Sequence, residues 1–180
     1  MMGLGGNLVT TRSGMLSLDE FAVGLSRLPR FAGQTVVPWT VAHHLLVCRQ
    51  LSLYRPDLAV HALLHDAHEA MTGDIPTTFK TRDLKRSQRR LDARIYSAFN
   101  VPLPTMVQAK QIKEIDSRAL LAEAAMVTPT ATYKRICLER GSEAREQDTF
   151  VVERLMTHPD DARHDLLHLL EFDIAKAAQA

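Results

Sequence analysis

Apolar residues recur at the three- and four-residue spacing of helices through most of the 180-residue chain. The spacing predicts helices over 17–29, 39–54, 56–73, 82–100, 104–127, 146–157 and 159–179. We find no segment with the strict alternation that a half-buried strand requires, and no internal repeat. The sequence therefore predicts an all-α, single-domain helical bundle of six to eight helices around one core.

Glycine, proline and helix-capping residues indicate where the helices of this bundle begin and end. Glycine is concentrated near the beginning of the chain, which predicts a flexible N-terminal arm over 1–16 and a helical domain over 17–180. Ser17 and Glu20 have the spacing of a capping box, which marks the start of the first helix. Pro129 and Gly141 favour an irregular segment over 128–145.

Composition excludes several classes of protein. The net charge of +1 predicts no broad nucleic-acid surface, and no run of eighteen apolar residues is present, so no membrane span is expected. Two cysteines in apolar helical patterns, Cys48 and Cys137, argue against a disulfide framework. Together with a start that does not resemble a signal peptide, they favour a cytoplasmic protein.

The segment 61–76, HALLHDAHEAMTGDIP, places three histidines and three carboxylates among apolar residues. His65 and Glu69 are four residues apart and Asp66 and Glu69 are three apart, so these side chains share one face of a helix. The alternative is a solvated helix face, which the preceding apolar residues disfavour. The motif His-Glu-x-x-His is absent, so a protease-type zinc site has no support.

Two more ionisable residues fall on apolar helical stripes. His44 shares its stripe with Val41 and Cys48, whereas His43 is predicted on the polar side of the same helix. Asp116 lies on an apolar stripe of 104–127, where its carboxylate would lose hydration without compensation. Taken singly, a hydrogen-bonded core histidine or an internal salt bridge explains each residue as well as a metal does.

Taken together, His44, His65, Asp66 and Asp116 favour a metal centre, because one bound cation would explain four buried ionisable groups on three helices.

With these four residues the chain resembles the HD-domain metal-dependent phosphohydrolases, whose pattern is a histidine, a distant His-Asp pair and a distant aspartate. The tighter resemblance, over about 17–125, is to small 5′-deoxynucleotidases and to phage-type enzymes that hydrolyse deoxynucleoside triphosphates such as dATP. Three features match that branch: an Arg-aromatic pair (Arg30-Phe31), the strings HDAHE and TGDIP, and a following lysine (Lys80). The departures are His43, Phe31 and Thr78, where the branch often has Glu or Gln, Trp and Pro.

The resemblance implies a role for each matched residue. Glu69 would transfer the proton of the attacking water or of the leaving oxygen, and Asp74 would help to organise the nucleophile or the sugar. Arg30 and Lys80 would bind phosphate, for which an ordinary surface charge is the alternative. Phe31 and Trp39 would line the base or sugar pocket, for which core packing is an equal alternative.

Two imidazoles and two carboxylates suit Mn, Co, Fe or Zn better than a purely oxygen-liganded Mg site, although Mg remains a candidate second ion. We therefore expect hydrolysis of deoxynucleoside monophosphates with release of phosphate. The alternatives are triphosphate release from deoxynucleoside triphosphates and a non-catalytic metal- or nucleotide-binding module. A third alternative, nucleic-acid binding by the basic stretch 80–90, competes with a solvated helix face. Family analogy implies a homo-oligomer.

Overall fold

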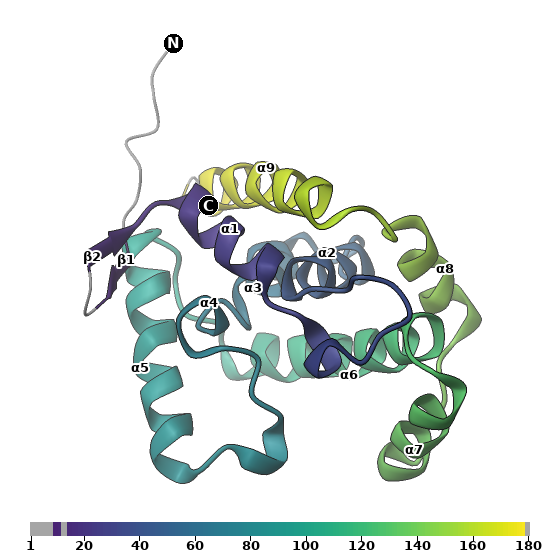
Figure 1. The fold of residues 1–180 in the computed structure, drawn as a ribbon. Coiled ribbons are helices and arrows are strands. Elements are labelled where there is room, and N and C mark those ends of the chain that lie inside the picture. The colour runs from purple at the N-terminus through teal and green to yellow at the C-terminus, as the bar shows by residue number, and fades with distance from the viewer. Residues whose placement is uncertain (1–8, 12–13, 179–180) are drawn as a thin grey trace.

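The computed structural model describes residues 9–11 and 14–178, and its fold is the expected all-α bundle (Figure 1). The α-helices are α1 (Leu18–Arg27), α2 (Val41–Leu51), α3 (Ala59–Leu64), α4 (Glu69–Thr72), α5 (Arg82–Ala98), α6 (Met106–Val127), α7 (Thr130–Arg140), α8 (Glu146–Arg154) and α9 (Pro159–Ala177). Short 3₁₀ turns are η1 (Arg30–Gly33), η2 (Pro56–Leu58) and η3 (Thr77–Phe79). None of the helices in these ranges is long and apolar enough to cross a membrane.

A short β-hairpin precedes the bundle, so the expectation of no strand is wrong there. Strands β1 (Val9–Thr11) and β2 (Gly14–Leu16) pair antiparallel, with Val9 opposite Leu16. The hairpin contacts α5 and α1, beside the upper end of α5 in Figure 1. Strands of three residues are too short to show a sequence alternation. The rest of the predicted arm, residues 1–8 and 12–13, lies outside the described residues.

The first helix begins where its capping box predicts. The Glu20 backbone N–H donates to Ser17 Oγ at 3.2 Å, and the Ser17 backbone N–H donates to the Glu20 carboxylate at 2.7 Å. These two bonds satisfy backbone donors that the first turn of a helix leaves free.

Helix α2 is the centre of the bundle and is enclosed by its neighbours (Figure 1). It contacts α1, α3, α6, α8 and α9, and every residue from Val41 to Cys48 is buried. One apolar cluster joins it to α1 and α9, and a second joins it to α6 and α8. A helix covered on all sides has no polar face, so the placement of His43 on a polar side is wrong.

Two segments differ from their predicted secondary structure. The predicted helix over 56–73 is broken into η2, α3 and α4, with a turn at residues 65–68 that contains the His-Asp pair. The segment predicted to be irregular contains α7, which begins after Pro129 and ends at Gly141. Proline near a helix start and a left-handed glycine at its end (φ +62° at Gly141) are boundary signals, not signs of a loop throughout.

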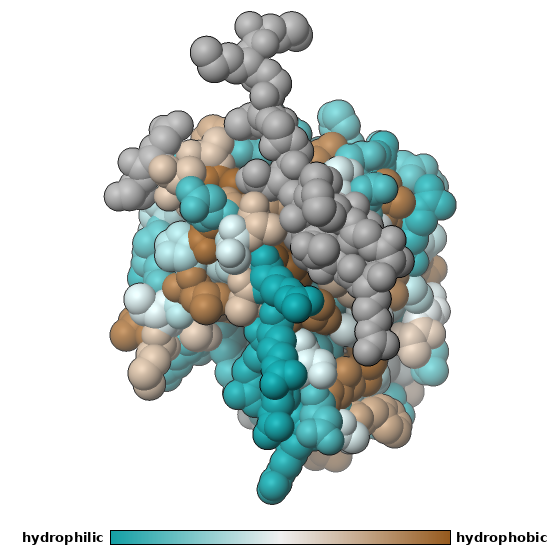
Figure 2. All heavy atoms as spheres, turned by 90° about the vertical axis from the view of Figure 1, so that its left-hand side faces the viewer, coloured by the Kyte–Doolittle hydropathy of each residue, from teal (hydrophilic) through white to brown (hydrophobic). Residues whose placement is uncertain are grey.

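Helix α5 has a strongly hydrophilic exposed surface, which faces the viewer in Figure 2. Its exposed basic side chains are Arg82, Lys85, Arg86, Arg89, Arg90 and Arg94. Inward-facing Ile95 and Tyr96 anchor the helix to the core. This pattern agrees with a solvated helix face, the simpler explanation of the basic stretch.

Candidate metal centre

The four predicted metal ligands lie together in the folded chain. His44 comes from α2, His65 and Asp66 from the turn after α3, and Asp116 from α6. The Nε2 atom of His44 lies 3.3 Å from His65 Nε2, 3.3 Å from Asp116 Oδ1 and 3.6 Å from Asp66 Oδ2. One ligand atom from each residue falls within 4.8 Å of the other three. The break between α3 and α4 brings the His-Asp pair toward α2.

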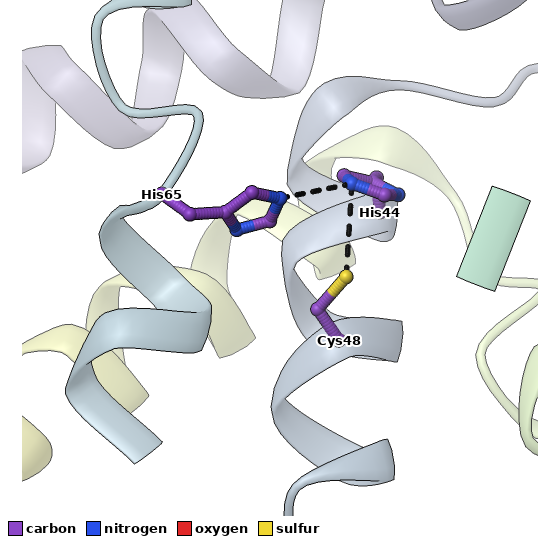
Figure 3. Close-up of side chains that lie close together, drawn as sticks. All are labelled: His44, Cys48 and His65. Carbon is purple, nitrogen blue, oxygen red and sulfur yellow. Dashed lines mark hydrogen bonds between the residues drawn. The ribbon is translucent and has the colours of Figure 1, made fainter. Parts of the chain in front are cut away.

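Hydrogen bonds on the far side of each imidazole fix which nitrogen faces the cluster. His44 donates its Nδ1–H to Glu123 at 2.8 Å, and His65 donates its Nδ1–H to the Ala62 carbonyl oxygen at 3.0 Å. Each ring therefore turns its Nε2 atom toward the other ring, and the dashed line in Figure 3 joins these two atoms, which lie 3.3 Å apart. Metal-binding histidines are commonly oriented in this way by a carboxylate or a carbonyl.

Two further residues at this centre were not predicted. Glu123 is fully buried on α6, and Cys48 Sγ lies 3.6 Å from His44 Nε2, one turn farther along α2 (Figure 3). The sequence contained a signal for Glu123, because it interrupts an apolar run and follows Asp116 by two helical turns. Cys48 had no such signal, since a buried cysteine is an ordinary small core residue.

The ionisation of the cluster follows from burial and opposite charge. Burial alone would lower the pKa of His65, but the adjacent Asp66 carboxylate raises it to about 10. Burial opposes ionisation of Asp66 too, yet His65 and His44 hold its pKa well below the usual range. Burial likewise works against a charged His44, but Cys48, Glu123 and Asp116 raise its pKa well above the usual value. The site thus favours positive charge at its centre.

The donor set fits a first-row divalent cation. It offers two imidazole nitrogens, whose protons a bound cation would replace, and two carboxylates, which together can neutralise a dipositive ion. Glu123 supports the set from outside by orienting His44. The described residues can therefore hold a metal ion at this position.

Glu69 and Lys80 lie beside the cluster. The Glu69 side chain is buried at the start of α4, and its Oε1 lies 3.8 Å from Lys80 Nζ. Burial, with the charges of Asp66 and Asp74, raises the pKa of Glu69 to about 8. Asp74 follows Gly73, whose φ of +81° lets the chain turn sharply at the end of α4. The carboxyl group of Glu69 is thus suited to hold or release a proton near neutral pH.

Arg30 is buried next to Glu123, which orients His44, and does not lie at the surface. It is 8% exposed, donates from its guanidinium to Glu123 at 3.2 Å, and Glu123 with Asp74 raises its pKa despite burial. The next two residues, Phe31 and Ala32, both have φ of +53°, an unfavourable conformation for residues other than glycine. Arg30 directly precedes this turn, and its guanidinium pairs with Glu123. A surface charge, the alternative interpretation of Arg30, is wrong.

The two predicted aromatic residues differ in exposure. Phe31 is half-buried against the second apolar cluster, with the Arg30 guanidinium 5.7 Å from its ring centre. Trp39 is 1% exposed and stacks on His43 with ring centres 4.5 Å apart. Full burial agrees with core packing for Trp39, the alternative to a pocket lining.

The remaining histidines lie outside the four-residue cluster. His43 accepts hydrogen bonds from Thr40 at Nδ1 and donates from Nε2 to the Thr157 carbonyl at 3.1 Å. His61 is buried and stacks on Tyr96, and His68 is buried with Nδ1 2.8 Å from Asp92. The three histidines near or within α9, His158, His164 and His168, are exposed, in agreement with their exclusion from the metal centre.

No family model matches the chain. A curated relative, the Uncharacterized protein YfdR of Escherichia coli (strain K12), is 38% identical over 87 residues. The match covers 47% of this chain and 48% of that protein, so the chain spans about half the length of the relative. Membership of the HD-domain family, the expected activity and the expected homo-oligomer therefore stay predictions.

Proposed function

We propose that the protein is a metal-dependent phosphohydrolase that releases phosphate from deoxynucleoside monophosphates. The observation that supports this most directly is the convergence of His44, His65, Asp66 and Asp116, with the buried Glu69 beside them. A purely structural metal site needs four ligands but no additional buried carboxylate next to a lysine. A divalent cation bound there would polarise the phosphoryl group and activate a water molecule.

Each neighbouring side chain has a task in this proposal. The ionised carboxylate of Glu69 would accept the proton of the attacking water, and the protonated form would return it to the leaving oxygen, because its pKa of about 8 makes both forms accessible near neutral pH. Lys80, 3.8 Å from Glu69, binds a phosphate oxygen. Asp74, at the turn after Gly73, orients the nucleophile or the sugar. Arg30 contributes positive charge from beneath the site while it remains paired with Glu123.

The positive charge that Arg30 and Lys80 offer favours a monophosphate over a triphosphate. Arg30 is paired with Glu123 and is partly neutralised, so Lys80 supplies most of the positive charge that these two residues present to phosphate. A triphosphate chain carries about two more negative charges than a monophosphate and would need further cations.

The test is a hydrolysis screen of deoxy- and ribonucleotides, from mono- to triphosphates, with Mn²⁺, Co²⁺, Fe²⁺, Zn²⁺ and Mg²⁺. We expect release of inorganic phosphate from deoxynucleoside monophosphates, and loss of turnover in Asp66→Ala and Glu69→Ala. His61→Gln, a change at a buried histidine outside the cluster, is the matched control and should keep activity. Normal turnover in Asp66→Ala would contradict the proposal. Release of triphosphate would show that deoxynucleoside triphosphates are the substrates. Metal binding without hydrolysis would favour the non-catalytic module.

A further inference from the structure

A second group of potential ligands adjoins the first centre. One ligand atom each from Asp66, His68 and Glu69 lies within 4.8 Å of the other two. His68 is 6% exposed and Glu69 is 3% exposed, so both side chains are removed from water. The trio occupies the turn after α3 and the first residue of α4.

Two atoms of this trio lack a hydrogen-bond partner although they are buried. They are His68 Nε2 and Glu69 Oε2. An unpaired buried polar atom destabilises the fold, so two in one small group indicate that a bound species satisfies them. His68 and Glu69 each offer a ligand atom within 4.8 Å of the other, so one bound species can contact both side chains.

The hydrogen bond on the other side of His68 determines what that species must be. Asp92 on α5 lies 2.8 Å from His68 Nδ1, and a carboxylate acts as the acceptor, so Nδ1 bears the proton. The remaining nitrogen, Nε2, then presents a lone pair. Oε2 of an ionised Glu69 is also an acceptor, so in that state the two atoms cannot bond to each other. A cation between them would satisfy both atoms and would hold Glu69 in its ionised state.

We propose that Asp66, His68 and Glu69 form a second divalent cation site that shares Asp66 with the first. Asp66 directs Oδ2 toward His44 and His65, which leaves its Oδ1 for the second ion. Glu69 directs Oε1 toward Lys80 and keeps Oε2 for the ion, so Oε1 remains available for proton transfer. Asp92 is a positioning residue that orients His68, as Glu123 orients His44.

The chemistry of the site indicates which ion it takes. One imidazole and two carboxylates form a harder donor set than the first centre, which favours Mn²⁺ over Zn²⁺. Paired ions in such sites are about 3.5–4 Å apart and together stabilise the attacking and leaving oxygens of a phosphoryl transfer. The inference rests on the proposed function only in assuming that a first ion binds at His44, His65, Asp66 and Asp116. It does not require that any nucleotide be hydrolysed.

The test is the stoichiometry of Mn²⁺ binding to the full chain after chelator treatment, measured by calorimetry and by electron paramagnetic resonance. We expect two ions per chain in the wild type, with the spectrum of a coupled pair. His68→Gln should bind one ion. His61→Gln, the same change at a neighbouring buried histidine, should still bind two.

A second variant keeps the test decisive if His68→Gln does not fold. Asp92→Asn leaves every ligand in place and should weaken only the second ion, by about 10- to 100-fold. One ion in the wild type, with a water between His68 and Glu69, would overturn the inference. So would two ions with unchanged affinity in both His68→Gln and Asp92→Asn. Two ions without nucleotide turnover would refute the proposed function alone, and turnover with one ion would refute this inference alone.

Discussion

Glu123 offers the sharpest test of how the metal centre is built, because it is fully buried and touches no substrate in the proposed function. Its carboxylate accepts one hydrogen bond from His44 at 2.8 Å and one from Arg30 at 3.2 Å. In Glu123→Gln the amide oxygen can accept a hydrogen bond from only one of these two donors, His44 or Arg30. The amide NH₂ group faces the other donor and cannot accept its hydrogen bond. The variant therefore loses one charged hydrogen bond and leaves Arg30 buried without its counter-charge.

Two magnitudes follow for Glu123→Gln. Loss of the carboxylate that orients His44 should weaken metal binding by about 10- to 100-fold, which corresponds to about 1.4–2.7 kcal/mol. Breaking a buried ion pair by removing one charge costs about 3–5 kcal/mol, and the retained amide oxygen favours the lower end. Titration with Mn²⁺ measures the first quantity, and urea unfolding in the presence of chelator measures the second.

A matched control separates the two effects. Arg118 and Asp148 form a comparable pair between α6 and α8, with Arg118 Nη2 2.6 Å from Asp148 Oδ1 and Asp148 almost fully buried. Asp148→Asn should lower stability and leave Mn²⁺ affinity unchanged. The reasoning fails if Glu123→Gln binds Mn²⁺ with wild-type affinity, or if Asp148→Asn weakens Mn²⁺ binding as much as Glu123→Gln does.

Four further outcomes are expected. Because the folded-state pKa of His65 is raised from 6.5 to about 10, its contribution to stability is full below pH 6.5 and is lost as the pH rises through 10. The chelator-treated protein should therefore become easier to unfold in urea between pH 6.5 and 10, and a constant midpoint would contradict this. Ala32→Gly should raise the free energy of unfolding by about 0.5–1 kcal/mol, because glycine relieves the strain at φ +53°; a lower thermal midpoint would refute that. His43→Gln should lower stability by about 1–3 kcal/mol without changing Mn²⁺ affinity, since its ring bonds only to protein groups. Lys80→Met should raise KM for a monophosphate about tenfold, measured by phosphate release, and an unchanged KM would exclude Lys80 from substrate binding.

Local patterns sufficed for part of the fold. The periodicity of α1, α2, α5, α6, α8 and α9 and the capping box at Ser17 are properties of neighbouring residues, so they could be predicted within a few positions. Boundary residues were harder to interpret. Pro129 and Gly141 indicated a loop in the sequence but delimit α7 in the structure, and the three-residue strands of the hairpin are shorter than any periodic signal.

The same division holds for the site. The sequence by itself indicated that His44 and Asp116 lie on apolar helical stripes and that the pair His65-Asp66 follows an apolar run, because an ionisable group among apolar neighbours can be recognised along the chain. Only the tertiary structure decided that their ligand atoms lie within 4.8 Å, that Glu123 orients His44, and that His68 is held by Asp92. It also decided that His43 is buried, since α2 is covered by five other helices. Distances between helices depend on how side chains pack across the core, and no spacing along one chain segment encodes them.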